Sequence, residues 1–169
     1  TSAMREATNS AELVTRIHKI LDMKIQIIDG AREAELINDV VVKLLNPKKN
    51  YLHIDVGGGS TELNFYRNQE KFASKSFKIG SVRLLEGKEK EGDWDKMKKW
   101  ISLQMESMNG AVYAVGTGGN ISKLYNLSDQ VSDHKTMDFS ELMRISNYIS
   151  AFTYEERVNK LRLNTDRAD

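Results

Sequence analysis

The chain has 169 residues and a nearly balanced charge, with 25 Lys and Arg against 24 Asp and Glu and a formal net charge of +1. It contains no cysteine, which excludes a disulfide-stapled module, a Cys-based zinc site and a cysteine nucleophile. The charge balance does not favour binding to a DNA or RNA duplex, although it allows a local basic patch. No apolar run approaches the roughly 20 residues of a membrane span, and residues 1–10 lack a signal-peptide core. We therefore expect one soluble, cytoplasmic domain and, because the sequence starts at Thr1 rather than Met, a fragment of a longer protein.

Apolar residues at helical spacing predict two helices in the first quarter of the chain. The first spans Ser10 to Leu21, with Asn9 and Glu12 placed like a capping pair. The β-branched run from Lys24 to Ile28 then predicts a short strand, and the second helix ends at Asn46-Pro47.

The rest of the chain alternates between strands and helices. Strands are predicted over residues 51–56, 61–66, 72–77 and 111–115, the second and third joined as a hairpin at 67–70. A helix containing Trp94 to Met105 is expected to be capped by Asp93, a short helix covers 120–127, and Asp138 with Glu141 is expected to cap a last helix. This alternation predicts an α/β fold with a mixed sheet and flanking helices.

A glycine-rich loop follows the strand that ends near Asp55. Three glycines, Gly57, Gly58 and Gly59, can turn consecutive N–H groups inward around a phosphate, and Ser60 can add a hydroxyl contact. Asp55 at the strand end, with Glu62 on the next strand, could hold Mg²⁺ directly or through water. The alternative is a plain hairpin turn with a bulge.

A second glycine cluster, with Gly116, Gly118 and Gly119, also follows a strand and opens a helix. The N–H groups at such a helix N-terminus favour an anion or a nucleotide. A tight strand-to-helix turn with no ligand is an equally good interpretation of this cluster alone. Two such loops in one small domain together predict a cleft that binds a chain of phosphates.

Glu33 is the best candidate for a general base, because it lies in the first turn of its helix at the edge of the buried face. Glu35 should face solvent. The alternative is that Glu33 only interacts favourably with the helix dipole.

Other polar residues give weaker signals. His18, His53 and His134 have no metal-ligand spacing, and His53 is predicted to face out from its strand. Three arginines flank apolar elements and could each bind phosphate in a bidentate manner, and the sequence does not choose among them: Arg5, Arg83 and Arg157.

Several segments in order along the chain resemble the exopolyphosphatase/guanosine pentaphosphate phosphohydrolase (Ppx/GppA) family. The resemblance covers nearly the whole chain, and its most specific part is the DxGGGSTE block with the upstream Gly-x-x-Glu-Ala helix. The segments that carry it are ATNSAELVTRIHKILDMKIQIIDGAREAELI, HIDVGGGSTEL, KIGSVRLLEG, AVGTGGNISKL and EERVNKLRLNTDRAD.

This resemblance implies an actin-like, ribonuclease-H-like α/β fold and Mg²⁺-dependent hydrolysis of the terminal phosphoanhydride of polyphosphate or guanosine pentaphosphate (pppGpp). It implies that Glu33 orients the attacking water, that Arg5 and Arg157 contact the phosphate chain, and that the two glycine loops bind phosphate or nucleotide. The positions that match the first loop and its acidic partners are Asp55, Gly57, Gly58, Gly59, Ser60 and Glu62, and those of the later loop are Gly116, Gly118 and Gly119.

The chain departs from the family pattern at Arg32-Glu33-Ala34-Glu35, where Glu-Glu-Ala-Arg is usual, and at Asn120, where Thr is commoner. The family's N-terminal subdomain, with its own phosphate loop, does not occur in residues 1–169. We therefore expect these residues to form a single domain, the second (C-terminal) subdomain of a catalytic unit, with little hydrolysis of its own.

The sequence thus predicts a Mg²⁺-dependent phosphohydrolase linked to the stringent response, with polyphosphate or pppGpp as substrate, the missing subdomain as partner, and no membrane partner. Two alternatives remain: a non-catalytic sensor of polyphosphate or pppGpp, and half of an actin-like kinase or ATPase. Homodimer formation is left open.

Overall fold

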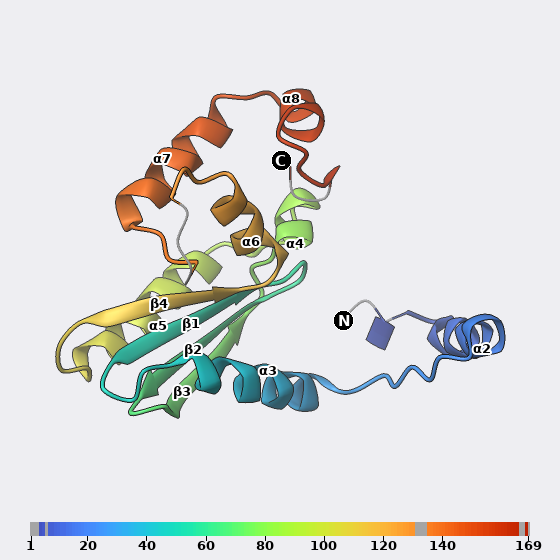
Figure 1. The fold of residues 1–169 in the computed structure, drawn as a ribbon, viewed down its shortest axis with the longest axis horizontal. Coiled ribbons are helices and arrows are strands. Elements are labelled where there is room, and N and C mark those ends of the chain that lie inside the picture. Colours follow the sequence, from blue (N-terminus) through green and yellow to red (C-terminus); the bar gives the residue numbers. More distant parts are fainter. Residues whose placement is uncertain (1–3, 6, 131–134, 166–167, 169) are drawn as a thin grey trace. The chain divides into compact units, whose positions relative to one another are not determined.

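The computed structural model describes residues 4–5, 7–130, 135–165 and 168 (Figure 1). By its internal contacts the chain divides into two compact units, Thr1–Leu45 and Asn46–Asp169. His134 lies outside the described residues. Within the described part of the chain, no helix is long and apolar enough to cross a membrane.

The first unit contains helices α2 (Ser10–Leu21) and α3 (Gly30–Leu44). The bounds of α2 are those predicted, and Asn9 occupies its N-cap as expected, but Asn9 makes no side-chain hydrogen bond to the helix. The strand predicted at 24–28 is also wrong, since residues 22–29 form neither helix nor strand. A strand needs a partner edge for its hydrogen bonds, and the four strands found among the described residues pair only with one another.

The second unit is built on a four-stranded mixed sheet, as predicted. The strands are β1 (Asn50–Val56), β2 (Thr61–Arg67), β3 (Glu70–Phe77) and β4 (Val112–Thr117), in the order β3-β2-β1-β4. The first three are antiparallel neighbours, and β4 lies parallel to β1 (Figure 1). Asn68 and Gln69, with φ of 52° and 63°, make the two-residue turn of the β2–β3 hairpin.

The two faces of the sheet differ in chemistry because side chains alternate along each strand. One face is apolar and packs against α5 (Asp93–Glu106). The ring centroid of Trp100 on α5 lies 5.8 Å from that of Phe77 and 5.7 Å from that of Phe65. The other face carries polar side chains on all four strands. The parallel connection from β3 to β4 runs through α5 and the short helix α4 (Ser81–Leu85).

Three helices follow β4: α6 (Gly119–Asn126), α7 (Phe139–Ser150) and α8 (Tyr154–Asn159) (Figure 1). The sequence analysis predicts α6 and α7 but neither α4 nor α8.

Of the two capping predictions in this unit, the one for Asp93 is wrong and the one for Asp138 is confirmed in position only. Asp93 is the first residue of α5, whose N-cap is Gly92. Asp138 occupies the N-cap of α7 but makes no side-chain hydrogen bond to the helix. Glu141 binds Arg144, Ser128 and the N–H of Asp129 instead.

Candidate active site

The first glycine loop connects β1 to β2 and turns sharply, with the N–H of Gly57 donating to the carbonyl of Ser60 at 2.9 Å. The loop carbonyls face α4. The N–H groups of Ser81 and Arg83 donate to the carbonyls of Gly57 and Gly58, each at 3.0 Å. The side chain of Arg83 also donates, from Nε, to the carbonyl of Gly59 at 3.0 Å.

This arrangement leaves the N–H groups of Gly58 and Gly59 available. Among the hydrogen bonds of the described residues, none uses the N–H of Gly58 or Gly59. A Cβ added at Gly59 would meet nothing within 4 Å, so the protein's own packing does not require a glycine there. Successive free N–H groups beside open space are suited to binding an anion such as a phosphate.

Gly80 is the residue that holds this loop from behind. A Cβ there would lie 2.5 Å from the carbonyl oxygen of Gly58 and 2.6 Å from the nitrogen of Ser60, so only glycine fits. Arg83 is one of the three candidate phosphate ligands predicted from the sequence, but in the structure its Nε donates a hydrogen bond to the loop carbonyl of Gly59. Neither supporting role could be predicted without the packing of α4 against the loop.

Two carboxylates lie at the same edge of the sheet as the loop. Asp55 on β1 and Glu62 on β2 are direct cross-strand partners, and Asp55 also pairs with Thr117 at the end of β4. One oxygen of Glu62 accepts hydrogen bonds from Ser60 Oγ at 2.5 Å and Ser76 Oγ at 2.9 Å. The hydroxyl of Ser60, predicted to contact phosphate, therefore donates to Glu62 here.

Asp55 and Glu62 are the residues that could hold a Mg²⁺ ion here. Among the described residues, no group of three or more His, Asp or Glu side chains could hold a metal ion. Mg²⁺ commonly takes one or two carboxylates and completes its shell with water and substrate phosphate oxygens. Asp55 and Glu62, half-buried and adjacent, match that pattern.

His53 does not face out from its strand, so that prediction is wrong: its side chain is only 1% exposed. Its Nε2 lies 2.9 Å from Thr117 Oγ1 on β4, and its Nδ1 lies 3.1 Å from Asn64 Nδ2 on β2. Burial lowers the pKa of His53, and the nearby charge of Asp55 partly opposes this effect. Cross-strand hydrogen bonds satisfy the buried polar ring of His53, which the sequence of β1 alone does not reveal.

The second glycine cluster connects β4 to α6, and packing explains two of its glycines. A Cβ at Gly116 would lie 2.7 Å from the side chain of Ile121, and Gly118 has a φ of +94° with Asp55 Oδ1 3.0 Å from the position of a Cβ. Gly119 is the first residue of α6. Because β1 and β4 are parallel neighbours, both glycine loops lie at the carboxyl edge of the sheet, where α/β folds commonly bind ligands.

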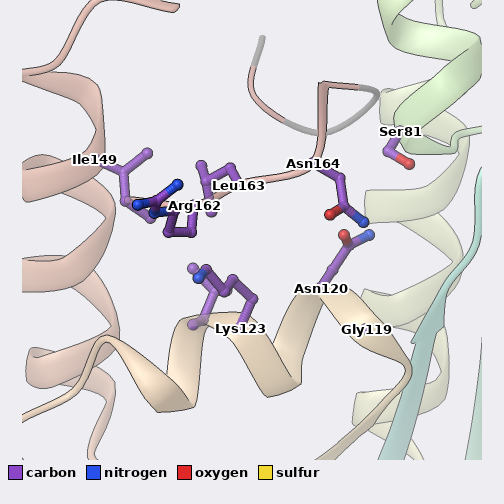
Figure 2. Close-up of a pocket in the computed structure, with 9 residues that line it drawn as sticks. Ser81, Gly119, Asn120, Lys123, Ile149, Arg162, Leu163 and Asn164 are labelled. Atoms are coloured by element: carbon purple, nitrogen blue, oxygen red, sulfur yellow. The ribbon is translucent and has the colours of Figure 1, made fainter. Parts of the chain in front are cut away.

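A cavity of about 330 Å³ lies beside the second loop (Figure 2). Asn120 on α6 and Asn164 point toward one another across it, and Lys123 and Arg162 also line it (Figure 2). No ion pair of Lys123 or Arg162 occurs within the described residues. Neither cation was predicted from the sequence, although Lys123 lies one helical turn after Asn120 and thus shares its side of α6.

Arg157 uses its guanidinium within the second unit. Nε donates to the carbonyl of Ile149 at 3.1 Å, and Nη1 donates to the carbonyl of Ala168 at 3.1 Å. These bonds tie α8 to the end of α7 and to the residues that follow α8. Its expected contact with phosphate stays a prediction.

In the first unit, Glu33 and Arg5 form an ion pair, with Arg5 Nη1 2.5 Å from Glu33 Oε2. Glu33 lies in the first turn of α3, which begins where Asp29 accepts a hydrogen bond from the N–H of Arg32 at 2.8 Å. Glu35 pairs with Arg32, and its side chain is 65% exposed, as predicted, whereas that of Glu33 is 36% exposed. The structure thus brings together two predicted site residues, Arg5 and Glu33, whose contact the sequence did not predict.

The family model described as the Ppx/GppA phosphatase family matches residues 1–169. A curated relative from Aliivibrio fischeri, named guanosine-5'-triphosphate,3'-diphosphate pyrophosphatase, is 26% identical over 179 residues, which cover 99% of this chain and 36% of the relative. A protein of the same name from Vibrio cholerae is 36% identical over 86 residues, covering 51% of this chain and 17% of the relative. The chain therefore spans about a third, or less, of these curated relatives.

This chain covers a larger fraction of the solved structures that it matches than of the curated relatives. An exopolyphosphatase from Cytophaga hutchinsonii matches 99% of this chain and 61% of its own, with 25% identity and a TM-score of 0.74. A Ppx/GppA family member from Aquifex aeolicus matches 99% of this chain and 59% of its own, with 23% identity and a TM-score of 0.62. These similarities, with the mixed sheet, confirm the predicted actin-like α/β class.

Proposed function

Because the chain belongs to the Ppx/GppA phosphatase family, we propose that the full-length protein is a phosphohydrolase that releases terminal phosphate from inorganic polyphosphate or pppGpp. The observation that carries this proposal is the first glycine loop, whose N–H groups at Gly58 and Gly59 are free beside open space, next to paired carboxylates. The names of the relatives support the substrate class. A link to the stringent response and a location in the cytoplasm belong to the same proposal.

The loop and its neighbours have distinct roles in this proposal. The N–H groups of Gly58 and Gly59 bind and orient the terminal phosphoryl group, and Gly57 sets the turn that aligns them. Asp55 and Glu62 would hold Mg²⁺, which neutralises phosphate charge when bound. Lys123, Arg157 and the N-terminus of α6 attract the remaining phosphates or a nucleotide.

Glu33 accepts a hydrogen bond from the attacking water and orients it toward phosphorus. Its carboxylate is held by Arg5, so one oxygen is fixed while the other is left for water. This role of Glu33 distinguishes a protein that hydrolyses the substrate from one that only binds it.

We also propose that residues 1–169 are the second subdomain of a larger catalytic unit. The support is the coverage of 36% of the Aliivibrio fischeri relative and about 60% of the solved structures. An actin-like unit binds its substrate between two subdomains, so the N-terminal subdomain would supply the other half of the site.

The test is Glu33→Gln in the full-length protein, with Glu35→Gln as the matched control on the same helix. Glu33→Gln should lower kcat for phosphate release by two to four orders of magnitude, roughly the contribution of a general base, while calorimetry shows nearly unchanged binding of tripolyphosphate with Mg²⁺. Glu35→Gln should behave like the wild type. Unchanged turnover of Glu33→Gln would remove the assignment, and tight binding without phosphate release by the wild type would indicate the sensor.

A further inference from the structure

A chain of hydrogen bonds crosses the polar face of the sheet and ends beside the glycine loops. Ser74 on β3 donates to Asn64 on β2 at 2.7 Å, Asn64 Nδ2 contacts Nδ1 of His53 on β1 at 3.1 Å, and His53 Nε2 contacts Thr117 on β4 at 2.9 Å. This series of hydrogen bonds therefore connects all four strands. Its last member, Thr117, lies within the second glycine cluster, between Gly116 and Gly118, and pairs with Asp55, which lies just before the first loop.

The direction of these bonds follows from the chemistry of the groups. An amide nitrogen can only donate, so Asn64 Nδ2–H donates and His53 Nδ1 must be the unprotonated, accepting nitrogen of the ring. The ring of neutral histidine then carries its hydrogen on Nε2 and donates it to Thr117 Oγ1.

A hydroxyl that accepts one hydrogen bond keeps its own hydrogen for another acceptor. Within the described residues, no acceptor is found for the hydroxyl hydrogen of Thr117. The side chain of Thr117 is partly exposed, whereas His53 is 1% exposed. The buried ring thus fixes a partly exposed donor at the edge where both glycine loops lie.

We propose that His53 is a positioning residue that acts through Thr117, holding the Thr117 hydroxyl so that it donates to a phosphate oxygen bound between the two glycine loops. The inference rests on the proposed phosphohydrolase function for its kinetic consequence. The link between His53 and Thr117, and the contact of Thr117 with the anion, do not depend on turnover.

Four variants in the full-length protein measure the kinetic part. Thr117→Val removes the hydroxyl at nearly constant shape and should lower kcat/KM about tenfold, the effect of one hydrogen bond to a charged group. Thr117→Ser should restore most of the loss. His53→Leu should cost a similar factor, and His53→Leu combined with Thr117→Val should cost no more than Thr117→Val alone. Additive losses, or a Thr117→Val variant equal to the wild type, would overturn the proposal.

Ser74→Ala is the matched control, because it removes the hydroxyl at the far end of the same series of hydrogen bonds. It should leave kcat and KM within about twofold of the wild type, since it does not touch His53 or Thr117. A loss equal to that of His53→Leu would mean that the whole network acts only by stabilising the sheet, which contradicts a specific role for Thr117.

Nuclear magnetic resonance of the full-length protein labelled with ¹⁵N-histidine tests the link without turnover. The ring of His53 should carry its hydrogen on Nε2 alone, and tripolyphosphate with Mg²⁺ should shift that signal in the wild type but not in Thr117→Val. Exposed His18 serves as the internal reference. A hydrogen on Nδ1, or equal shifts in both proteins, would contradict the proposal. If the wild type released no phosphate, the proposed function would fail while this measurement still decided the role of His53.

Discussion

At the scale of single residues, glycines in and around the first loop serve different purposes. Gly80 is required by packing, because a Cβ there would overlap the backbone of Gly58, whereas a Cβ at Gly59 would project into open space. A sequence motif marks Gly57, Gly58 and Gly59 as one unit. The structure separates a glycine that the fold needs from one that only a ligand would need.

This difference gives a paired prediction. Gly59→Ala should fold with stability close to that of the wild type but bind tripolyphosphate with Mg²⁺ about tenfold more weakly, because the new methyl group occupies the space of the anion. Gly80→Ala should lower the free energy of unfolding by about 1–3 kcal/mol, as over-packing does. Urea denaturation and calorimetry measure the two effects. Unchanged affinity of Gly59→Ala would show that the anion does not approach the loop from this side.

At the scale of elements, hydrophobic periodicity predicted the bounds of α2 and placed all four strands of the sheet within a few residues. It failed where tertiary partners decide the outcome. The run at 24–28 has strand-forming residues but no partner strand among the described residues, and His53 is buried because Asn64 and Thr117 on neighbouring strands satisfy its ring.

The candidate site, like the fold, was predictable only in part from the sequence. Motifs located both glycine loops, Asp55, Glu62 and Glu33. The roles of Gly80, Arg83 and Thr117 depend on distances between elements, and Lys123 and Arg162 emerged only with the cavity that they line.

A network at the start of α7 predicts a dependence of stability on pH. Glu141 accepts two hydrogen bonds from Arg144 and others from Ser128 and the N–H of Asp129, and the Arg144 contacts chiefly hold the pKa of Glu141 at about 2, below its ordinary value of 4.5. A carboxyl with a lower pKa in the folded state stabilises above its unfolded pKa, so this contribution is complete above pH 4.5 and is lost as the pH falls toward 2.

Glu141→Gln tests this dependence. The difference in unfolding free energy between the wild type and Glu141→Gln should be largest near pH 6 and should shrink between pH 4.5 and 2. Glu155→Gln, at an exposed position on α8, is the control. A difference that stays constant over this pH range would contradict the role of the Glu141 carboxylate.

The N-terminus of α8 gives a second prediction at this scale. Thr153 Oγ1 accepts a hydrogen bond from the N–H of Glu156 at 3.3 Å, and the Glu156 carboxylate accepts one from the N–H of Thr153 at 3.1 Å, which together form a capping box. Thr153→Ala should cost about 1 kcal/mol of unfolding free energy. Asn9→Ala, at the N-cap of α2 without such a bond, should cost less. Equal losses in urea denaturation would contradict the cap assignment.

At the scale of the whole molecule, the sheet brings together at one edge the two glycine loops, the carboxylate pair of Asp55 and Glu62, and the Thr117 hydroxyl. The chain covers 36% of the Aliivibrio fischeri relative and 61% of the Cytophaga hutchinsonii structure. We propose that this edge is half of the catalytic site. Residues 1–169 alone should therefore release little phosphate.

The proposed phosphohydrolase activity is tested most directly by measuring phosphate release by the full-length protein with Mg²⁺, offered long-chain polyphosphate and pppGpp side by side. We expect release from at least one substrate and a far lower rate from residues 1–169 alone. Release would also identify the preferred substrate. No release from either substrate by a folded full-length protein would contradict the assignment as a phosphohydrolase.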